Sequence, residues 1–343
     1  MVLIIREIMI PTVLGEIHED DLGITSSHEH IFINMKGCVN ITGDEPPVFY
    51  DKITMENRCE VFKDPYGILD NALLEGIDDA VSELEYFKQY GGQTVVDVTL
   101  DEIGRNPLAL KEVSKRTGVN IILGCGHYYH KAHFPYVKDA TVEQLAKEMI
   151  DDITIGIGDT GIKAGVIGEI GTSAIISDDE MKCLIAAGIA GKETGKAIHV
   201  HTDLYTENGY EIVNVLTDQG VAPDKICIDH VDVLLRPDYI KDLLDMGVYV
   251  EFDDFGKEFY VSKDTRFAYD LERIYVLRDL IDQGYSDKIL VCNDICLKTM
   301  WKKYGGSGYA HILRTVRDMA IENGIDSKVY DKILTDNVKN FLV

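Results

Sequence analysis

Short apolar, β-branched runs alternate with longer segments of helical periodicity along most of the chain, and this alternation restricts the fold more than any other property of the sequence. The expected strands are residues 24–30, 94–99, 120–124, 165–170, 197–201, 226–230, 248–252 and 289–294. The expected helices are residues 73–90, 107–117, 142–157, 178–194, 210–219, 239–246 and 268–283. A strand–helix alternation of this length predicts an α/β fold, a parallel (β/α)8 TIM barrel.

The chain contains no Pro/Gly/Ser-rich linker that would divide it, so residues 1–343 are expected to form one barrel domain. The segment between the first two strands is unusually long. Its prolines and glycines predict a loop insertion at about residues 36–70, which would cover one face of the barrel. Residues 309–343 are expected to form the last helix and a C-terminal helical extension.

The chain is strongly acidic, with a formal charge of −25 from 34 Lys and Arg against 59 Asp and Glu. A field of this sign repels phosphate backbones and anionic lipid, so we expect neither a nucleic-acid nor a membrane partner. Seven scattered cysteines without a C-x-x-C motif argue against a disulfide framework, and the N-terminus lacks a signal-peptide pattern. These features predict a cytoplasmic protein that acts on a small molecule.

Histidines and carboxylates gather at the predicted strand ends. His28 and His30 lie two residues apart, so both imidazoles would point to the same side of an extended strand. Two such side chains could simply face water, but other strands also end in residues of ligand type. These are Glu169, His201, His230 and Asp294. Because a barrel builds its site at the rim formed by the C-terminal strand ends, we expect all six side chains to face one space.

This donor set suits divalent metal ions. Imidazoles and carboxylates bind Zn²⁺, Mn²⁺, Co²⁺ or Fe²⁺, and six ligands exceed what one tetrahedral ion needs, so two ions are expected, with zinc as the first candidate. Glu169 would bridge them, although a glutamate at a strand end can also be an ordinary exposed residue. His199 is expected one layer deeper than His201, as a buried histidine behind the ligands. Three loop histidines match no ligand spacing and are expected at the pocket wall or the surface: His127, His130 and His133.

Six segments form a specific combination: T-S-S-H-E-H at 25–30, G-V-I-G-E-I-G at 165–171, H-T at 201–202, C-I-D-H at 227–230, L-V-C-N-D at 290–294 and Y-G-G-S-G-Y-A-H at 304–311. Together they resemble the phosphotriesterase-like family of the amidohydrolase superfamily, across essentially the whole chain. The resemblance implies a barrel with a binuclear metal centre at its C-terminal rim. In that centre His28, His30 and Asp294 would hold the more buried ion, and His201 and His230 the more exposed one.

Many members of this family bridge the two ions with a carboxylated lysine on the fourth strand. Here that position is Gly168. The next residue, Glu169, resembles the members that bridge through a glutamate instead. Lys163 lies too early on the strand to take the place of the lysine. The resemblance therefore implies a glutamate-bridged centre.

The resemblance also implies a reaction. A hydroxide held between the two ions would attack the substrate, and Asp294 would orient it and move its proton. Tyr128 matches the position where lactone-hydrolysing relatives carry a tyrosine near the metals, so it is expected to orient the substrate, although it could be only an aromatic wall. The expected activity is cleavage of a lactone, a cyclic ester. Members of the family commonly form homodimers, and we expect the same here.

Cations near the barrel mouth extend this expectation to a phosphorylated sugar lactone. Lys257, Lys263 and Arg266 follow the seventh strand and Lys298 follows the eighth, so they could select an anionic substrate in an otherwise acidic chain. They could equally be solvated loop charges. Asp254 stands where some lactonases place an arginine.

Two alternatives remain open. Among enzymes, the same centre could serve a phosphotriesterase or a carboxylesterase. From another class, the chain could be a catalytically silent metal-binding barrel, as happens when a ligand is replaced. All six candidate ligands are present, which favours an enzyme.

Overall fold

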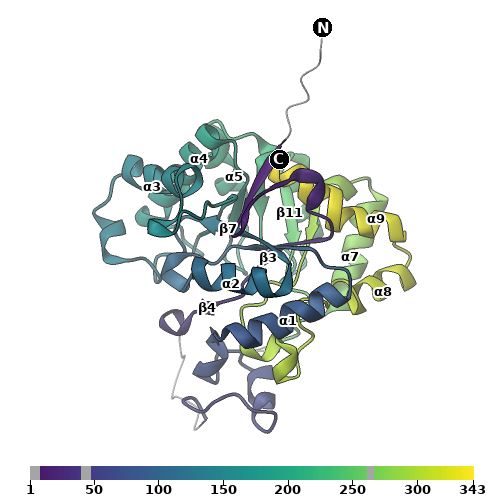
Figure 1. Ribbon diagram of the computed structural model, residues 1–343. Helices are drawn as coiled ribbons and strands as arrows, with labels where there is room; N and C mark the ends of the chain where they lie inside the picture. The colour runs from purple at the N-terminus through teal and green to yellow at the C-terminus, as the bar shows by residue number, and fades with distance from the viewer. Residues whose placement is uncertain (1–7, 40–47, 261–265) are drawn as a thin grey trace.

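The computed structural model describes residues 8–39, 48–260 and 266–343. Its centre is a barrel of eight parallel strands in the order β12-β11-β10-β9-β8-β7-β6-β3 (Figure 1). The strands are β3 (Thr25–Glu29), β6 (Thr94–Asp97), β7 (Asn120–Cys125), β8 (Val166–Gly171), β9 (Ile198–His201), β10 (Ile226–Ile228), β11 (Tyr249–Phe252) and β12 (Ile289–Val291). The predicted (β/α)8 fold is confirmed, and each expected strand is present with ends shifted by a few residues.

A buried carboxylate joins the two ends of this sheet. Glu29, the last residue of β3, accepts hydrogen bonds from the backbone N–H groups of Asn293 (3.1 Å) and Ile295 (2.7 Å), which follow β12. The hydroxyl of Ser26 donates to the same carboxylate at 2.7 Å. Burial raises the pKa of Glu29, and these donors oppose that shift by stabilising the charge. The side chain thus completes the barrel at the point where β3 meets β12.

Helices surround the barrel (Figure 1). They are α1 (Ile77–Gln89), α2 (Pro107–Thr117), α3 (Val142–Thr154), α4 (Asp178–Thr194), α5 (Gly209–Asp218), α6 (Pro237–Asp245), α7 (Asp270–Asp282) and α8 (Thr315–Glu322). The bounds of α2 and α4 agree with the sequence at both ends because their caps are explicit. Asn106 caps the first turn of α2, Ser177 and Glu180 form a capping box on α4, and each helix ends at a left-handed glycine, Gly118 or Gly195.

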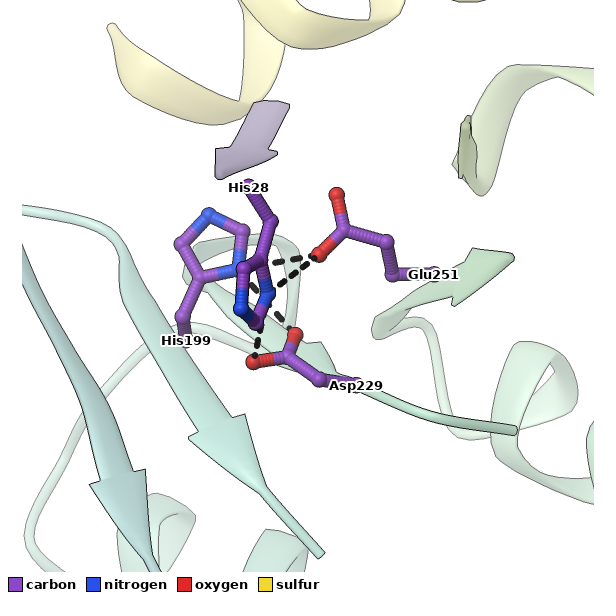
Figure 2. A group of neighbouring side chains, drawn as sticks. All are labelled: His28, His199, Asp229 and Glu251. Carbon is purple, nitrogen blue, oxygen red and sulfur yellow. Dashed lines mark hydrogen bonds and ion pairs between the residues drawn. The ribbon is translucent and has the colours of Figure 1, made fainter. Parts of the chain in front are cut away.

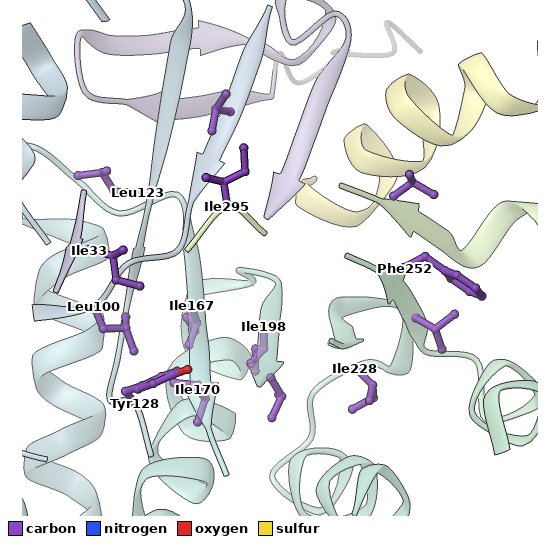
Figure 3. Packing of buried hydrophobic residues seen from close by; sticks show 14 of the residues in the cluster. Ile33, Leu100, Leu123, Tyr128, Ile167, Ile170, Ile198, Ile228, Phe252 and Ile295 are labelled. Carbon is purple, nitrogen blue, oxygen red and sulfur yellow. The ribbon is translucent and has the colours of Figure 1, made fainter. Parts of the chain in front are cut away.

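Successive strand residues alternate between two apolar layers. Ile198, Ile228 and Phe252 belong to the large cluster between the strands and the helices (Figure 3). A second cluster fills the barrel interior near the N-terminal strand ends, with contributions from Ala197, Cys227, Tyr249 and Leu290. This period of two means that residues further along the same strands also point inward, toward the C-terminal rim.

The two ends of the chain close the opposite end of the barrel. The antiparallel pair β1 (Met9–Thr12) and β2 (Gly15–His18) packs there with the C-terminal segment, which comprises α9 (Ser327–Lys332), a π-helical turn (Ile333–Asn337) and α10 (Val338–Leu342). The ring of Phe341 lies 5.1 Å from that of Tyr249 and 4.9 Å from that of His199. Water is thereby kept from the lower barrel interior.

The insertion after β3 lies at the end of the barrel formed by the C-terminal strand ends. Its base is an antiparallel pair, β4 (Ile33–Asn34) with β5 (Leu73–Leu74), and residues 40–47 fall outside the described part. Two contacts tie it to the loop after β12, since Lys298 Nζ lies 2.9 Å from Asp70 Oδ2 and the Thr299 N–H donates to Asn71 Oδ1 at 2.9 Å. The insertion is therefore placed to form part of a pocket wall over the barrel mouth.

Candidate metal centre

The six strand-end residues converge at the C-terminal rim. His30 Nε2 lies 3.1 Å from Glu169 Oε1 and 3.1 Å from Asp294 Oδ1. His28 Nε2 lies 3.6 Å from Glu169 Oε2 and 3.7 Å from Asp294 Oδ1. Residues from β3, β8 and the end of β12 thus bring two imidazoles and two carboxylates together.

Glu169 stands at the centre of the group. Its Oε2 lies 3.2 Å from His201 Nδ1 and 3.7 Å from His230 Nε2, while its Oε1 faces His30. His201 Nδ1 and His230 Nε2 are themselves 2.8 Å apart. One carboxylate therefore contacts both halves of the group, as a ligand shared by two ions would.

Several features show that this donor set fits metal ions. The Nε2 atom of His28 is buried without a hydrogen-bond partner, yet faces two carboxylate oxygens. Donors that share one ion at about 2 Å lie about 3–4 Å apart, which matches these distances. Among the described residues other than glycine, only His230 (φ 62°) and Asp294 (φ 43°) have positive φ. Backbone of this kind costs about 1–3 kcal/mol and is found mainly at functional sites.

The acids and imidazoles of the site shift one another's pKa values. Burial alone would raise the pKa of Glu169, but hydrogen bonds to His201, His230 and His30 hold it well below its usual value. Burial would lower the pKa of His30, whereas Asp294 and Glu169 outweigh it and raise that pKa to about 9. Without metal, the raised pKa of His30 favours a protonated ring beside the carboxylates, and a cation would replace that proton.

The backbone explains why no lysine occupies the fourth strand here. Gly168 has φ of +113°, and a Cβ added to it would lie 2.3 Å from the carbonyl oxygen of His199. Any side chain would collide with β9 at this position. The neighbouring Glu169 points into the site instead.

A cavity of about 350 Å³ opens above these residues. Its wall is mainly apolar and aromatic, and it is formed by Met35, Pro65, Tyr66, Tyr128, Leu204, Tyr205, Phe259, Phe267 and Leu297. Pro65 and Tyr66 come from the insertion after β3. The Tyr128 hydroxyl lies 3.3 Å from His201 Nδ1, and burial holds the pKa of Tyr128 well above its usual value, so the phenol remains a neutral donor.

The predicted substrate cations have different positions. Lys257 lines the cavity and is ion-paired with Asp294 Oδ2 and, at 2.8 Å, with Asp254 Oδ1. Arg266 and Lys298 do not line it. Arg266 pairs with Glu272 at 2.7 Å, and Lys298 pairs with Asp70 beneath the insertion. Lys263 lies outside the described residues.

The loop histidines support the backbone that carries Tyr128 rather than lining the cavity. His127 Nδ1 lies 2.7 Å from Glu102, whose other oxygen accepts the Tyr128 N–H at 2.7 Å. His133 Nε2 donates to the Tyr128 carbonyl at 2.6 Å. His199 is fully buried behind the ligands, as expected. Trp301 is also buried and donates to the Tyr309 hydroxyl at 3.1 Å, so it packs loops together.

Glu180 holds the loop that carries Tyr128, and its protonation makes the stability of the fold depend on pH. Burial would raise its pKa, but hydrogen bonds from the backbone of His130, the hydroxyl of Ser173 and the backbone of Ser177 lower it to about 2. A depressed pKa stabilises the fold above the unfolded value of about 4.3 and loses that contribution as the pH falls toward 2. Glu180→Gln should therefore melt below the wild type at pH 7, and the gap should narrow between pH 4.5 and 2. A melting-temperature gap that stays constant with pH would contradict this.

Three acids of this region were not predicted from the sequence: Asp229, Glu251 and Asp253. His230 Nδ1 lies 3.1 Å from Asp253 Oδ2, and the other two carboxylates contact His28. A signal was present, because Glu251 interrupts an apolar strand at an inward position two residues beyond Tyr249. Strand alternation applied to Glu251 predicts an acid in the barrel interior.

Comparison with known proteins agrees with this geometry. The model of the Phosphotriesterase family matches residues 8–342. The chain belongs to this family. Its members are metal-dependent hydrolases, and the chain is accordingly a hydrolase rather than a silent barrel. Across the described residues, the helices are too short or too polar to cross a bilayer.

Individual relatives cover nearly the whole chain. An N-acetyltaurine hydrolase from Xenopus tropicalis is 34% identical over 339 residues, 97% of each chain. Among solved structures, a resiniferatoxin-binding protein from Rhodobacter sphaeroides superposes with a TM-score of 0.94 at 27% identity, covering 97% of this chain and 94% of that one. A lactonase from Listeria monocytogenes gives 0.79 at 26% identity, with 98% and 99% covered.

Proposed function

We propose that the chain hydrolyses a small neutral carboxylic ester, with a lactone as the first candidate, at a binuclear metal centre, with zinc as the first choice of metal. The proposed ligands are His28, His30, Glu169, His201, His230 and Asp294. The observation that carries the proposal is the convergence of these side chains on one end of a small, mostly apolar cavity. The homodimer expected from the family belongs to the same proposal, and sedimentation velocity tests it.

Each half of the group has its own donors. His28, His30 and Asp294 would hold one ion and His201 with His230 the other, with Glu169 shared because its two oxygens face both sets. Two divalent cations bound there would lower the pKa of a bound water and polarise the carbonyl oxygen under attack.

We infer that Asp294 acts as the proton acceptor. One of its oxygens faces His30, and the other is ion-paired with Lys257, which fixes the orientation of the carboxylate. The ion pair with Lys257 and contacts to the histidines keep the pKa of Asp294 low despite its burial, which favours the ionised form that a proton acceptor requires. Lys257 is thus a positioning residue for Asp294.

We infer that Tyr128 orients the substrate. Its neutral phenol faces the same space as His201, so it can donate a hydrogen bond to the substrate oxygen. Tyr128→Phe should raise KM about 2–13-fold and leave kcat within about threefold, since one neutral hydrogen bond contributes about 0.5–1.5 kcal/mol. Steady-state kinetics on the best lactone measure both values. An unchanged KM would assign Tyr128 to the wall alone.

The charge of the cavity favours a neutral substrate over a phosphorylated sugar lactone. Lys257 is the only Lys or Arg among the described residues that line it, and both of its carboxylate partners are buried beside it. A phosphate would have to compete with Asp254 and Asp294 for that ammonium group. The apolar wall, in contrast, suits an acyl chain or ring.

A second candidate is an N-acyl amide. Relatives from several animals that are 34–35% identical over 97% of this chain are named N-acetyltaurine hydrolases. Amide and ester hydrolysis share attack of water on a carboxyl carbon, so the same residues can serve both. The sulfonate of such a substrate would need a cation, and the one Lys or Arg in the described wall, Lys257, is already paired with Asp254 and Asp294.

A substrate panel on the metal-reconstituted protein separates these options. The panel contains neutral lactones, a phosphorylated sugar lactone, N-acetyltaurine, a simple carboxylic ester and a phosphotriester. We expect kcat/KM to be highest for a neutral lactone, and Lys257→Met to lower activity through kcat by disturbing Asp294. Higher kcat/KM for N-acetyltaurine would select the second candidate. Hydrolysis of the phosphotriester alone would overturn the carboxylic ester proposal.

A further inference from the structure

A layer of charged side chains lies inside the barrel directly beneath the candidate metal centre. It is formed by His28, His199, Asp229 and Glu251, all fully buried (Figure 2). The interior of such barrels is usually filled with branched apolar side chains. Removing two carboxylates from water costs several kcal/mol for each of them unless partners compensate. Their presence here therefore needs a reason beyond packing.

Strand alternation places these residues between an apolar layer and the metal-binding layer. Inward positions run from Ala197 to His199 and His201 on β9, and from Tyr249 to Glu251 on β11. Asp229 follows Cys227 in the same way after β10. On β9 the layer thus lies one step below the proposed ligand His201, and His28 belongs to both layers.

His28 connects the two layers through its two ring nitrogens. Nε2 faces upward to Glu169 and Asp294 and has no hydrogen-bond partner. Nδ1 faces downward and lies 3.2 Å from Glu251 Oε2 and 3.4 Å from Asp229 Oδ2. Figure 2 shows the ring between these two carboxylates.

Each of the two carboxylates has a second partner at the oxygen that does not face His28. The hydroxyl of Ser27 on β3 donates to the other oxygen of Glu251. His199 Nδ1 lies 3.0 Å from the other oxygen of Asp229. Because these supports come from different strands, the orientation of both acids is set by the barrel itself.

We propose that Asp229 and Glu251 are positioning residues that keep the proton of His28 on Nδ1 and leave Nε2 free for the more buried metal ion. A neutral imidazole carries one N–H, and two carboxylates beside Nδ1 select the tautomer that places it there. They also fix the ring and strengthen Nε2 as a donor. This inference rests on the proposed binuclear centre. His30 differs, because its Nδ1 contacts only the hydroxyl of Thr99, at 2.8 Å.

The test removes one charge without changing shape. Metal-free Glu251→Gln is titrated with Zn²⁺ against a chromophoric chelator, and with Co²⁺ by its visible absorption. We expect one of two metal equivalents to bind about 10–100-fold more weakly than in the wild type, the range typical for residues behind a ligand. At saturating metal, kcat should recover to within about threefold with KM unchanged.

Glu83→Gln is the matched control. Glu83 is a buried glutamate on α1 that accepts hydrogen bonds from the backbone N–H groups of Lys302 and Lys303. It should leave both metal affinities unchanged. Should Glu251→Gln fail to fold, Ser27→Ala provides a milder test, because it removes only the hydroxyl that donates to Glu251. The Zn²⁺ affinity of the same metal site should then fall by a smaller factor. Glu251→Asp, which keeps the charge, should bind metal more tightly than Glu251→Gln.

Each result decides the inference separately from the proposed function. Equal Zn²⁺ affinities in Glu251→Gln and Glu83→Gln would overturn the positioning role. A third metal equivalent in the wild type that Glu251→Gln lacks would also overturn it, because the layer would then bind metal itself. Zn²⁺ affinity that falls in Glu251→Gln supports the inference even if the wild type hydrolyses no lactone, since that failure would concern only the substrate.

Discussion

Asp294→Asn should lower kcat by about 10³-fold on the best substrate while the protein keeps its fold. The carboxamide retains the size of the side chain but cannot accept a proton, and proton transfer by a positioned side chain contributes about 10²–10⁴-fold. The change also leaves Lys257 with one carboxylate partner, Asp254. KM should change by less than about threefold, because Asp294 acts on the attacking water rather than on the substrate. Steady-state kinetics at saturating Zn²⁺ measure the effect.

Asp70→Asn provides the control for this variant. Asp70 is also a buried aspartate paired with a lysine, since it lies 2.9 Å from Lys298, but it does not line the cavity. It should lower the melting temperature and leave kcat within about twofold. Turnover in Asp294→Asn at the level of the Asp70→Asn control would remove Asp294 from the reaction.

Much of the fold could be predicted because it is encoded locally. Each central strand is an apolar run long enough to cross the barrel, and its partner strand follows one helix later, so sequence order gives spatial order. Strand ends were the least accurate. The expected strand at 289–294 ends in the structure at Val291, because Asn293 and Ile295 hydrogen-bond to the side chain of Glu29 rather than to a strand.

The positions of the candidate metal ligands could be predicted for a similar reason. A residue at a C-terminal strand end is placed by the barrel whatever its loop does, so His201 and His230 could be located from strand position alone. The surroundings of Lys298 could not be predicted from strand position. Its partner Asp70 lies 228 positions earlier in the chain, in the insertion, and local periodicity contains no information on contacts between loops.

The same limit applies to substrate recognition. Lys257 looked like a free cation for a phosphate, but the structure pairs it with Asp254 and Asp294. The aromatic wall joins Tyr66 from the insertion to Phe259 and Phe267 from the loop after β11. Such a wall depends on how loops of different origin meet over the barrel, and this is the part of the site that pattern reasoning cannot supply.

Glu169→Gln should have the other large effect, the loss of one metal ion. The two oxygens of Glu169 lie close to both halves of the group, so an amide there can serve one ion at most and without charge. We expect binding of one of two Zn²⁺ equivalents to weaken by more than about 100-fold. This loss of affinity exceeds the loss typical of mutating residues that only orient a ligand. Activity should fall by about 10³-fold or more and should not return when Zn²⁺ is added in moderate excess.

Metal analysis after gel filtration, together with Zn²⁺ competition titration, tests this expectation. Glu83→Gln again serves as the control, because it removes a buried carboxylate that only accepts backbone N–H groups. Its metal content should equal that of the wild type. Two tightly bound equivalents in Glu169→Gln would show that the ions do not share this carboxylate. The fourth strand would then supply no bridging ligand. The neighbouring position, Gly168, could not supply one either, because a side chain there would collide with the carbonyl of His199.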